Sequence, residues 1–196
     1  MARRLGAESS EVRARLIETA AQILRSEGAA AITARRIADA VGLKRQIVHY
    51  YFGTIEELIV AMLLRDEEST RQHYEQALQG EEPLQMIRGV GIDASVRVHE
   101  FAALAFRHES IRVEYARSIE EFRRMFVDAL TRHLASRGLT SNVPVVVVAT
   151  MVQMMAQAVA SESMLGVSEG HAEINAYLDR WLDAFSRSGT SPAIPD

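Results

Sequence analysis

A short run of cationic, polar and aromatic side chains at residues 44–50 has the chemistry to recognise nucleic acid. Arg45 and Gln46 can each pair with a base through two hydrogen bonds, arginine with guanine and glutamine with adenine. Ile47 could contact a thymine methyl group, and His49 could contact either a base or a phosphate. The run contains no carboxylate that would repel a polyanion. These residue types therefore favour DNA binding by one exposed helix face.

Four further side chains in the same region suit the phosphate backbone, which positions a protein on DNA without specifying its sequence. They are Thr33, Arg36, Lys44 and Tyr50. The alternative for each of these candidates, and for the base-contacting ones, is an ordinary solvated side chain.

The residues around these candidates predict a helix, a tight turn and a second helix over residues 33–52. Thr33 can cap the first helix through its hydroxyl, and Gly42 can end it in the left-handed conformation. Ala38 is small, so the two helices can cross closely, and Val48 begins the apolar face of the second helix. This is the pattern of a helix-turn-helix, whose second helix enters the major groove of DNA. The spacing alone also fits a helical corner of another all-α protein.

The elements before this segment should support it. We expect residues 1–8 to form a loose basic arm and a first helix to begin at Ser9 or Ser10, with Gly28 ending it. Packed against the helix-turn-helix, this helix would complete a three-helix domain.

Charge is divided unevenly along the chain. Residues 1–53 contain nine Lys or Arg against five Asp or Glu, a net charge of +4. Because the whole chain carries −4, the remainder carries −8. A polyanion is attracted to the first part and repelled by the second. An ordinary fluctuation of surface charge is the alternative, but the basic residues coincide with the helix-turn-helix.

Composition sets the broad class of the protein. The 196 residues are 48% hydrophobic, which is ample for a core, and contain no cysteine, which fits a reducing cytoplasm. No signal peptide is recognisable at the N-terminus. Helical stripes without strand signals follow residue 53. We therefore predict an all-α protein with a DNA-binding domain over 1–53, a helical domain over 54–187 and a disordered tail over 188–196.

The segment Val143–Ala160 is apolar over nearly the length of a membrane span. Gln153 and Gln157 would be costly in lipid, and basic flanking residues are lacking, so we expect no membrane association. A helix that is apolar almost all round is buried on several sides. We expect it to pair with the last amphipathic helix and with their copies as a four-helix bundle. The predicted dimer contacts are Val148, Val152, Met155, Tyr177, Leu178, Trp181 and Phe185.

Methionines are frequent after residue 60. Methionine adapts to irregular apolar space, which suggests a pocket for a hydrophobic ligand, to which a few polar side chains would contribute. The predicted lining is Met62, Arg97, His99, Tyr115, Phe122, Met125, Gln153 and Gln157. Plain core packing, or a surface position for the polar residues, is the alternative.

An enzyme is the competing functional class. The nearest candidates for acid–base chemistry, His108 with Glu109 and Asp93 with His99, form no recognisable constellation. The six histidines are scattered, and no two stand one helical turn apart as a helical metal site requires. We therefore expect no catalytic residue, no metal and no cofactor, and keep a helical enzyme as a remote alternative.

Five short runs of residues carry a family resemblance: Arg25-Ser26-Glu27-Gly28, Ile32-Thr33, Ile37-Ala38-Asp39-Ala40-Val41-Gly42-Leu43, Val48-His49-Tyr50-Tyr51-Phe52 and Glu56-Glu57-Leu58. Through them the stretch from 12 to 58 resembles the tetracycline-repressor (TetR) family of bacterial transcriptional regulators. The resemblance implies an all-α homodimer whose C-terminal domain dimerises and usually holds a small effector. The effector releases the protein from a palindromic operator. A repressor is the expected function, with an activator or a ligand-independent DNA-binding protein as the alternative.

The sequence departs from the family pattern at four positions. The family commonly has serine where Lys44 stands, a small residue at Gln46, tyrosine at His49 and lysine at Ile55. These differences put the operator sequence in doubt and leave the expectation of DNA binding in place.

Overall fold

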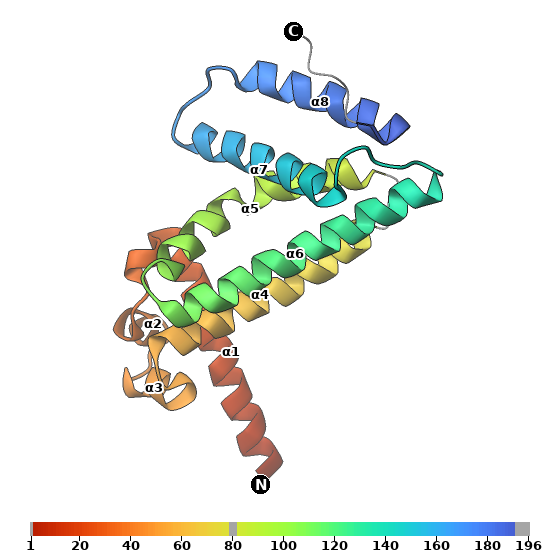
Figure 1. The fold of residues 1–196 in the computed structure, drawn as a ribbon. Helices are drawn as coiled ribbons and strands as arrows, with labels where there is room; N and C mark the ends of the chain where they lie inside the picture. The colour runs from red at the N-terminus through yellow and green to blue at the C-terminus, as the bar shows by residue number, and fades with distance from the viewer. Residues whose placement is uncertain (1, 79–81, 191–196) are drawn as a thin grey trace. The chain divides into compact units, whose positions relative to one another are not determined.

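The computed structural model describes the backbone of residues 2–78 and 82–190, and the side chains of 10–78, 82–90 and 98–190. Within these ranges the chain is helical and contains no strand, so the predicted all-α fold is confirmed (Figure 1). The helices are α1 (Ala2–Glu27), a 3₁₀ helix η1 (Ala29–Ala31), α2 (Ala34–Ala40), α3 (Gln46–Phe52), α4 (Ile55–Ala77), α5 (Pro83–Ala105), α6 (Glu109–Ser136), α7 (Val145–Met164) and α8 (His171–Ser188).

The chain forms two compact units. The N-terminal unit is Met1–Thr70 with His99–Ser118, and the C-terminal unit is Arg71–Val98 with Ile119–Asp196. The N-terminal unit thus includes part of α4, the end of α5 and the start of α6, because their apolar residues share its core. The functional division predicted at residue 53 stays a prediction.

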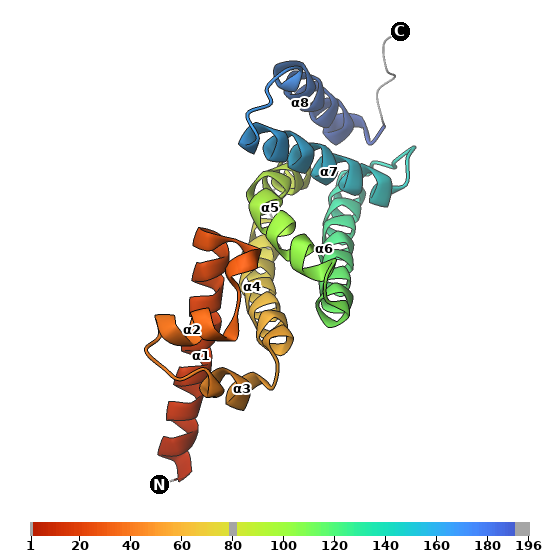
Figure 2. The same cartoon turned by 90° about the vertical axis from the view of Figure 1, so that its left-hand side faces the viewer.

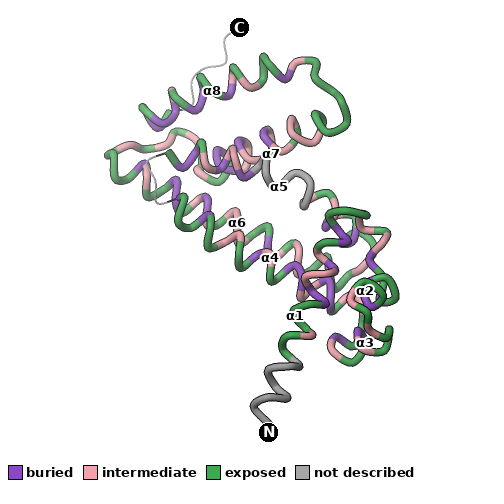
Figure 3. Tube along the Cα trace, turned by 180° about the vertical axis from the view of Figure 1, so that it is seen from behind, coloured by how far each residue is buried: buried purple, intermediate pink, exposed green. Residues whose placement is uncertain are grey.

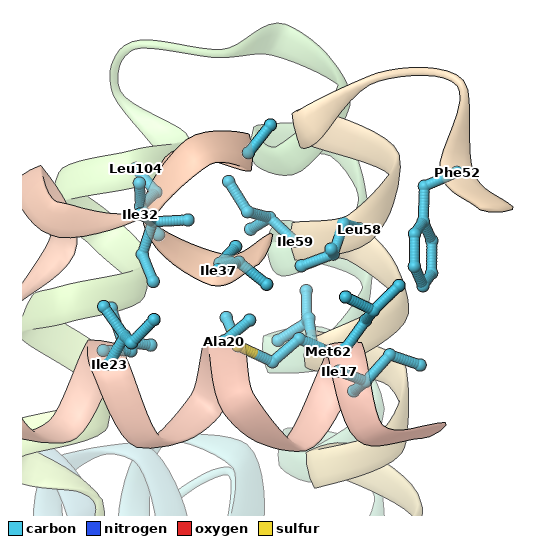
Figure 4. Packing of buried hydrophobic residues seen from close by; sticks show 14 of the residues in the cluster. Ile17, Ala20, Ile23, Ile32, Ile37, Phe52, Leu58, Ile59, Met62 and Leu104 are labelled. Carbon is cyan, nitrogen blue, oxygen red and sulfur yellow. The ribbon is translucent and has the colours of Figure 1, made fainter. Parts of the chain in front are cut away.

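Aliphatic side chains from α1, α2 and α4 fill the core of the N-terminal unit. Figure 4 shows them pointing toward one another, with Ile37 of α2 among them. Ile37 and Ala20 are fully buried, and Met62 of α4 is 2% exposed. Burying a side chain of the size of Ile37 contributes about 1.5–3 kcal/mol. The core therefore fixes α2, and through the following turn it positions α3.

Aromatic and branched side chains from α6, α7 and α8 form the core of the C-terminal unit. The rings of Trp181 and Phe185 stack with centroids 5.1 Å apart and planes inclined by 11°. Phe126 of α6 is fully buried in the same core. Helix α8 is therefore attached to α6 and α7 by large apolar side chains.

Helix α7 is long and apolar enough to meet a length-and-composition criterion for a membrane span, with a mean hydropathy of 1.5. Its residues Val148, Ala149, Val152 and Ala156 are buried within the unit. Part of the apolar surface of α7 therefore packs inside the C-terminal unit.

The ends of the chain differ from the sequence expectation in one respect. Helix α1 begins at Ala2, so the loose arm expected over residues 1–8 is wrong. Alanine, arginine, leucine and glutamate dominate this stretch and all favour helix. At the other end α8 stops at Ser188, and residues 191–196 of the predicted tail lie outside the described residues.

Candidate nucleic-acid interface

Thr33 begins helix α2 as predicted. Its backbone is extended, with φ −135° and ψ 149°, and its Oγ1 accepts a hydrogen bond of 3.1 Å from the amide of Arg36. A cap of this kind stabilises a helix by about 1 kcal/mol. The hydroxyl hydrogen of Thr33 remains available to a phosphate.

Gly42 makes the turn between α2 and α3. Its φ of 71° is a conformation that L side chains rarely adopt. The amide of Leu43 donates to the carbonyl of Ala38 at 2.9 Å, and the amide of Gly42 donates to that of Asp39 at 3.2 Å. These two bonds form a Schellman motif, which ends the helix and sets the direction of the chain into α3.

Two side chains of α3 anchor this helix in the core of the N-terminal unit. Val48 is fully buried and Phe52 is 4% exposed. The guanidinium of Arg13 on α1 lies 4.9 Å from the centre of the Phe52 ring, close enough for a cation–π contact. Figure 2 shows α2 and α3 beside α1. Helix α3 is therefore a short element whose inner face is anchored.

The outer face of α3 and the turn before it carry the predicted DNA-contacting residues. Lys44, Arg45, Gln46, His49 and Tyr50 are all exposed, and Figure 3 shows the exposed stretches of α3 in green. Tyr50 is 79% exposed, and its ring meets that of its neighbour Tyr51 edge-on at 5.1 Å. The structure thus brings these five side chains together on one short segment.

Ile47 lies differently from its neighbours. It is half-buried and packs against the core of the N-terminal unit. A thymine methyl could meet only its exposed part, because the rest of the side chain already has apolar partners. Periodicity placed Ile47 on the outer face, whereas core packing draws it inward.

Arg36 also differs from the simple expectation of a phosphate contact. Its Nη2 lies 2.5 Å from Oε1 of Glu27 and its Nε lies 3.0 Å from Oε2, so the pair is bidentate. Hydrogen bonding to Arg36 lowers the pKa of Glu27, and the same bonds raise the pKa of Arg36. A phosphate would have to compete with this carboxylate. The two residues lie on either side of η1, and helical spacing does not relate them.

Gly53 helps to orient the side chain of His49, a role that the sequence pattern does not predict. Its carbonyl oxygen lies 2.9 Å from Nδ1 of His49, and its amide donates to the carbonyl of His49 at 2.9 Å. Gly53 adopts φ 69° at the end of α3. A glycine after an apolar run predicts a helix end, but not that its carbonyl fixes a side chain of the preceding turn.

The residues predicted to line an effector pocket are divided between the two units. In the N-terminal unit Met62 is a core residue, His99 is exposed, and Tyr115 stacks on Phe101 with centroids 6.0 Å apart. At 2% exposure Met62 packs in the core of its own unit, and its role as a pocket residue stays a prediction. The side chain of Arg97 lies outside the described residues.

The remaining predicted pocket residues belong to the C-terminal unit. Phe122 and Met125 pack against its core, and Gln153 and Gln157 are half-buried on α7. An open surface pocket of this unit, about 280 Å³, is lined by other residues of α6 and α7: Glu120, Arg123, Arg124, Val127, Asp128 and Val146. The location of an effector site therefore stays a prediction.

Five of the seven residues predicted as dimer contacts lie inside their own subunit. Val148, Val152, Leu178, Trp181 and Phe185 are at most 6% exposed and belong to the core of the C-terminal unit. A side chain enclosed in this way offers a partner little surface, and the role of these five residues as dimer contacts stays a prediction. Met155 and Tyr177 are half-buried.

Other apolar residues of the same two helices remain exposed. Val146, Val147 and Met154 on α7 are 44–59% exposed, and Ile174 on α8 is 37% exposed. Sequence periodicity distinguishes an apolar face from a polar one, but it does not show which apolar residues the subunit itself covers.

Comparison with known proteins supports the same interpretation of the N-terminal segment. Residues 16–62 match the family described as bacterial regulatory proteins, tetR family. No curated protein matches the chain.

Several solved structures share the fold over most of the chain. A TetR transcription regulator from Haloarcula marismortui is 21% identical with a TM-score of 0.69, covering 89% of this chain and 98% of the other. A protein from Saccharomonospora viridis in complex with choline is 14% identical with a TM-score of 0.72, covering 89% and 96%. The regulator FadR from Bacillus subtilis, in complex with stearoyl-CoA, is 13% identical with a TM-score of 0.61, covering 89% and 97%. At these identities the likeness concerns the fold.

Proposed function

We propose that this chain, whose residues 16–62 belong to the tetR family of bacterial regulatory proteins, is a homodimeric repressor that binds a palindromic DNA operator in the cytoplasm. The observation that carries the proposal is the exposed polar face of α3 together with the cationic turn before it, Lys44 and Arg45, held in place by the buried anchors Val48 and Phe52. A helix held on one side and polar on the other suits insertion into the major groove.

The exposed residues divide by chemistry into two roles. Arg45 and Gln46 recognise bases, because each can form two hydrogen bonds to a base edge in the major groove. Lys44, Tyr50 and Thr33 contact phosphates and position the helix. Arg36 joins them only where a phosphate displaces Glu27.

Dimerisation supplies the second recognition helix. The exposed apolar residues Val146, Val147 and Met154 on α7, with Ile174 on α8, are the surface that we propose a second copy covers. A two-fold dimer places its two α3 helices on half-sites about one helical turn of DNA apart, or somewhat more.

A small hydrophobic effector that releases the DNA is the third part of the proposal. Structural neighbours were solved with choline, a small organic cation, and with stearoyl-CoA, which carries a long apolar chain. In this chain Phe122, Met125, Gln153 and Gln157 combine apolar surface with amide groups and suit such a ligand. An activator or a ligand-independent DNA-binding protein is the second candidate.

Selection of bound sequences from random double-stranded DNA tests the proposal. We expect enrichment of a palindrome, with full-length protein binding it as a dimer. Arg187→Ala, which removes an exposed arginine from α8, is the matched control and should select the same palindrome. Enrichment of no sequence would contradict operator recognition, and enrichment of an asymmetric single site would contradict the two-fold dimer.

Titration of the selected complex with candidate apolar metabolites separates the two candidates. Release of DNA by one of them supports an effector-controlled repressor. A complex that no metabolite of the panel releases favours the ligand-independent alternative.

A further inference from the structure

The orientation of the His49 imidazole restricts what this side chain can bind. His49 is exposed on α3, and its Nδ1 lies 2.9 Å from the carbonyl oxygen of Gly53. A carbonyl oxygen accepts hydrogen bonds and never donates them. Nδ1 must therefore carry the proton of this bond.

The backbone holds the acceptor in place. The amide of Gly53 donates to the carbonyl of His49, so residues 49 and 53 are joined by one backbone hydrogen bond and one hydrogen bond from the side chain. With φ 69°, Gly53 occupies a conformation that favours glycine. The carbonyl thus has a defined direction, and the imidazole ring is fixed by it.

A neutral imidazole with its proton on Nδ1 has a lone pair on Nε2 and no second N–H group. Such a ring accepts a hydrogen bond at Nε2. It has nothing to donate to a phosphate oxygen, because its one N–H is already directed at Gly53. For the neutral form of the ring, this geometry favours a base contact over a phosphate contact.

We propose that His49 accepts a hydrogen bond at Nε2 from an exocyclic amino group of adenine or cytosine in the major groove. Only these two bases present an amino donor there, whereas guanine and thymine present acceptors. His49 follows Arg45 by four residues and Gln46 by three, so the three side chains share one helix face. The inference rests on the proposed function, because it requires that α3 binds DNA.

The tautomer can be tested without DNA. Long-range nitrogen–proton NMR of the full-length protein distinguishes Nδ1–H from Nε2–H, and the His49→Gln variant identifies the signals of this ring. We expect the neutral form of the ring to carry its proton on Nδ1. A neutral ring protonated on Nε2 would overturn the proposal, whatever the protein binds.

The base contact is tested on the selected operator with analogues that lack the exocyclic amino group, purine for adenine and 2-pyrimidinone for cytosine. At one position in each half-site the analogue should weaken wild-type binding about 3- to 10-fold, the effect of one lost hydrogen bond. The same analogue should leave the affinity of the His49→Ala variant for the duplex unchanged. His49→Gln, which keeps an acceptor, should retain part of the effect, and His49→Lys, which has only donors, should lose it.

The outcomes separate this inference from the proposed function. A wild-type protein that binds its operator but shows no analogue position coupled to His49 overturns the acceptor role alone. A protein that binds no DNA overturns the proposed function and this inference with it. Arg187→Ala should behave as wild type on every duplex.

Discussion

The two units differ in how their candidate binding residues relate to their cores. In the N-terminal unit Lys44, Arg45 and Gln46 are exposed beside a buried scaffold, as the sequence predicts. In the C-terminal unit Trp181 and Phe185, predicted to meet a partner, are buried in their own subunit. The difference shows that an amphipathic pattern identifies which face is covered, but not whether the subunit or its partner covers it.

Truncation of Phe185 should have the largest effect on stability. Phe185→Ala removes a fully buried ring and should cost about 3–5 kcal/mol, measured by urea unfolding of the full-length protein. Ile174→Ala on the same helix removes a side chain that is 37% exposed and should cost clearly less. Equal losses for the two variants would contradict the assignment of Phe185 to the core.

A pair of glycine substitutions compares backbone constraint in the two units. Gly42→Ala should destabilise by about 1–2 kcal/mol, because Gly42 has φ 71°. Gly89→Ala, inside α5 and with open space around the added Cβ, should stabilise by about 0.5–1 kcal/mol. Thermal unfolding of both variants should give shifts of opposite sign. Shifts of the same sign would contradict the turn that positions α3.

The features that the sequence predicts correctly are encoded within a few residues. The Thr33 cap and the Gly42 turn each depend on neighbours less than two helical turns away. Val48 lies on the apolar face that the pattern of α3 predicts, although the core that buries it comes from other helices. The pairing of Arg36 with Glu27 depends on the path of the chain through η1, which helical periodicity does not describe. The core of α8 depends on α6 and α7, whose packing angles the pattern of one helix does not contain.

The two units should also respond differently to acid. Burial, and then the charge of Arg137, lower the pKa of His133 in the C-terminal unit. A lowered pKa means that the unfolded chain binds the proton more readily than the folded chain does. The contribution of neutral His133 to the free energy of unfolding is therefore complete above about pH 6.5, and it is lost as pH falls through the lowered pKa of the folded state. Hydrogen bonds from Arg65 and Arg36 lower the pKa values of Glu18 and Glu27 in the N-terminal unit. The stabilisation from these two Arg–Glu pairs is present above about pH 4.5 and is lost only as the pH falls below that value.

Urea unfolding of wild type and His133→Gln between pH 4 and 8 measures this difference, which should be the smallest of the stability effects. The variant should lose less stability than wild type as the pH falls below about 6.5, because it lacks the imidazole that the unfolded wild-type chain protonates first. A variant that follows wild type throughout the range would contradict the role of His133.

Salt-dependent anisotropy of the full-length protein on the selected operator and on an unrelated duplex measures whether α3 binds DNA. Lys44→Ala should weaken binding to both duplexes alike and reduce the slope of log affinity against log salt by about 1. Arg45→Ala should reduce the preference for the operator by about 1–3 kcal/mol. Arg187→Ala should change neither quantity. Lys44→Ala and Arg45→Ala variants that bind both duplexes as wild type does would contradict DNA binding by α3.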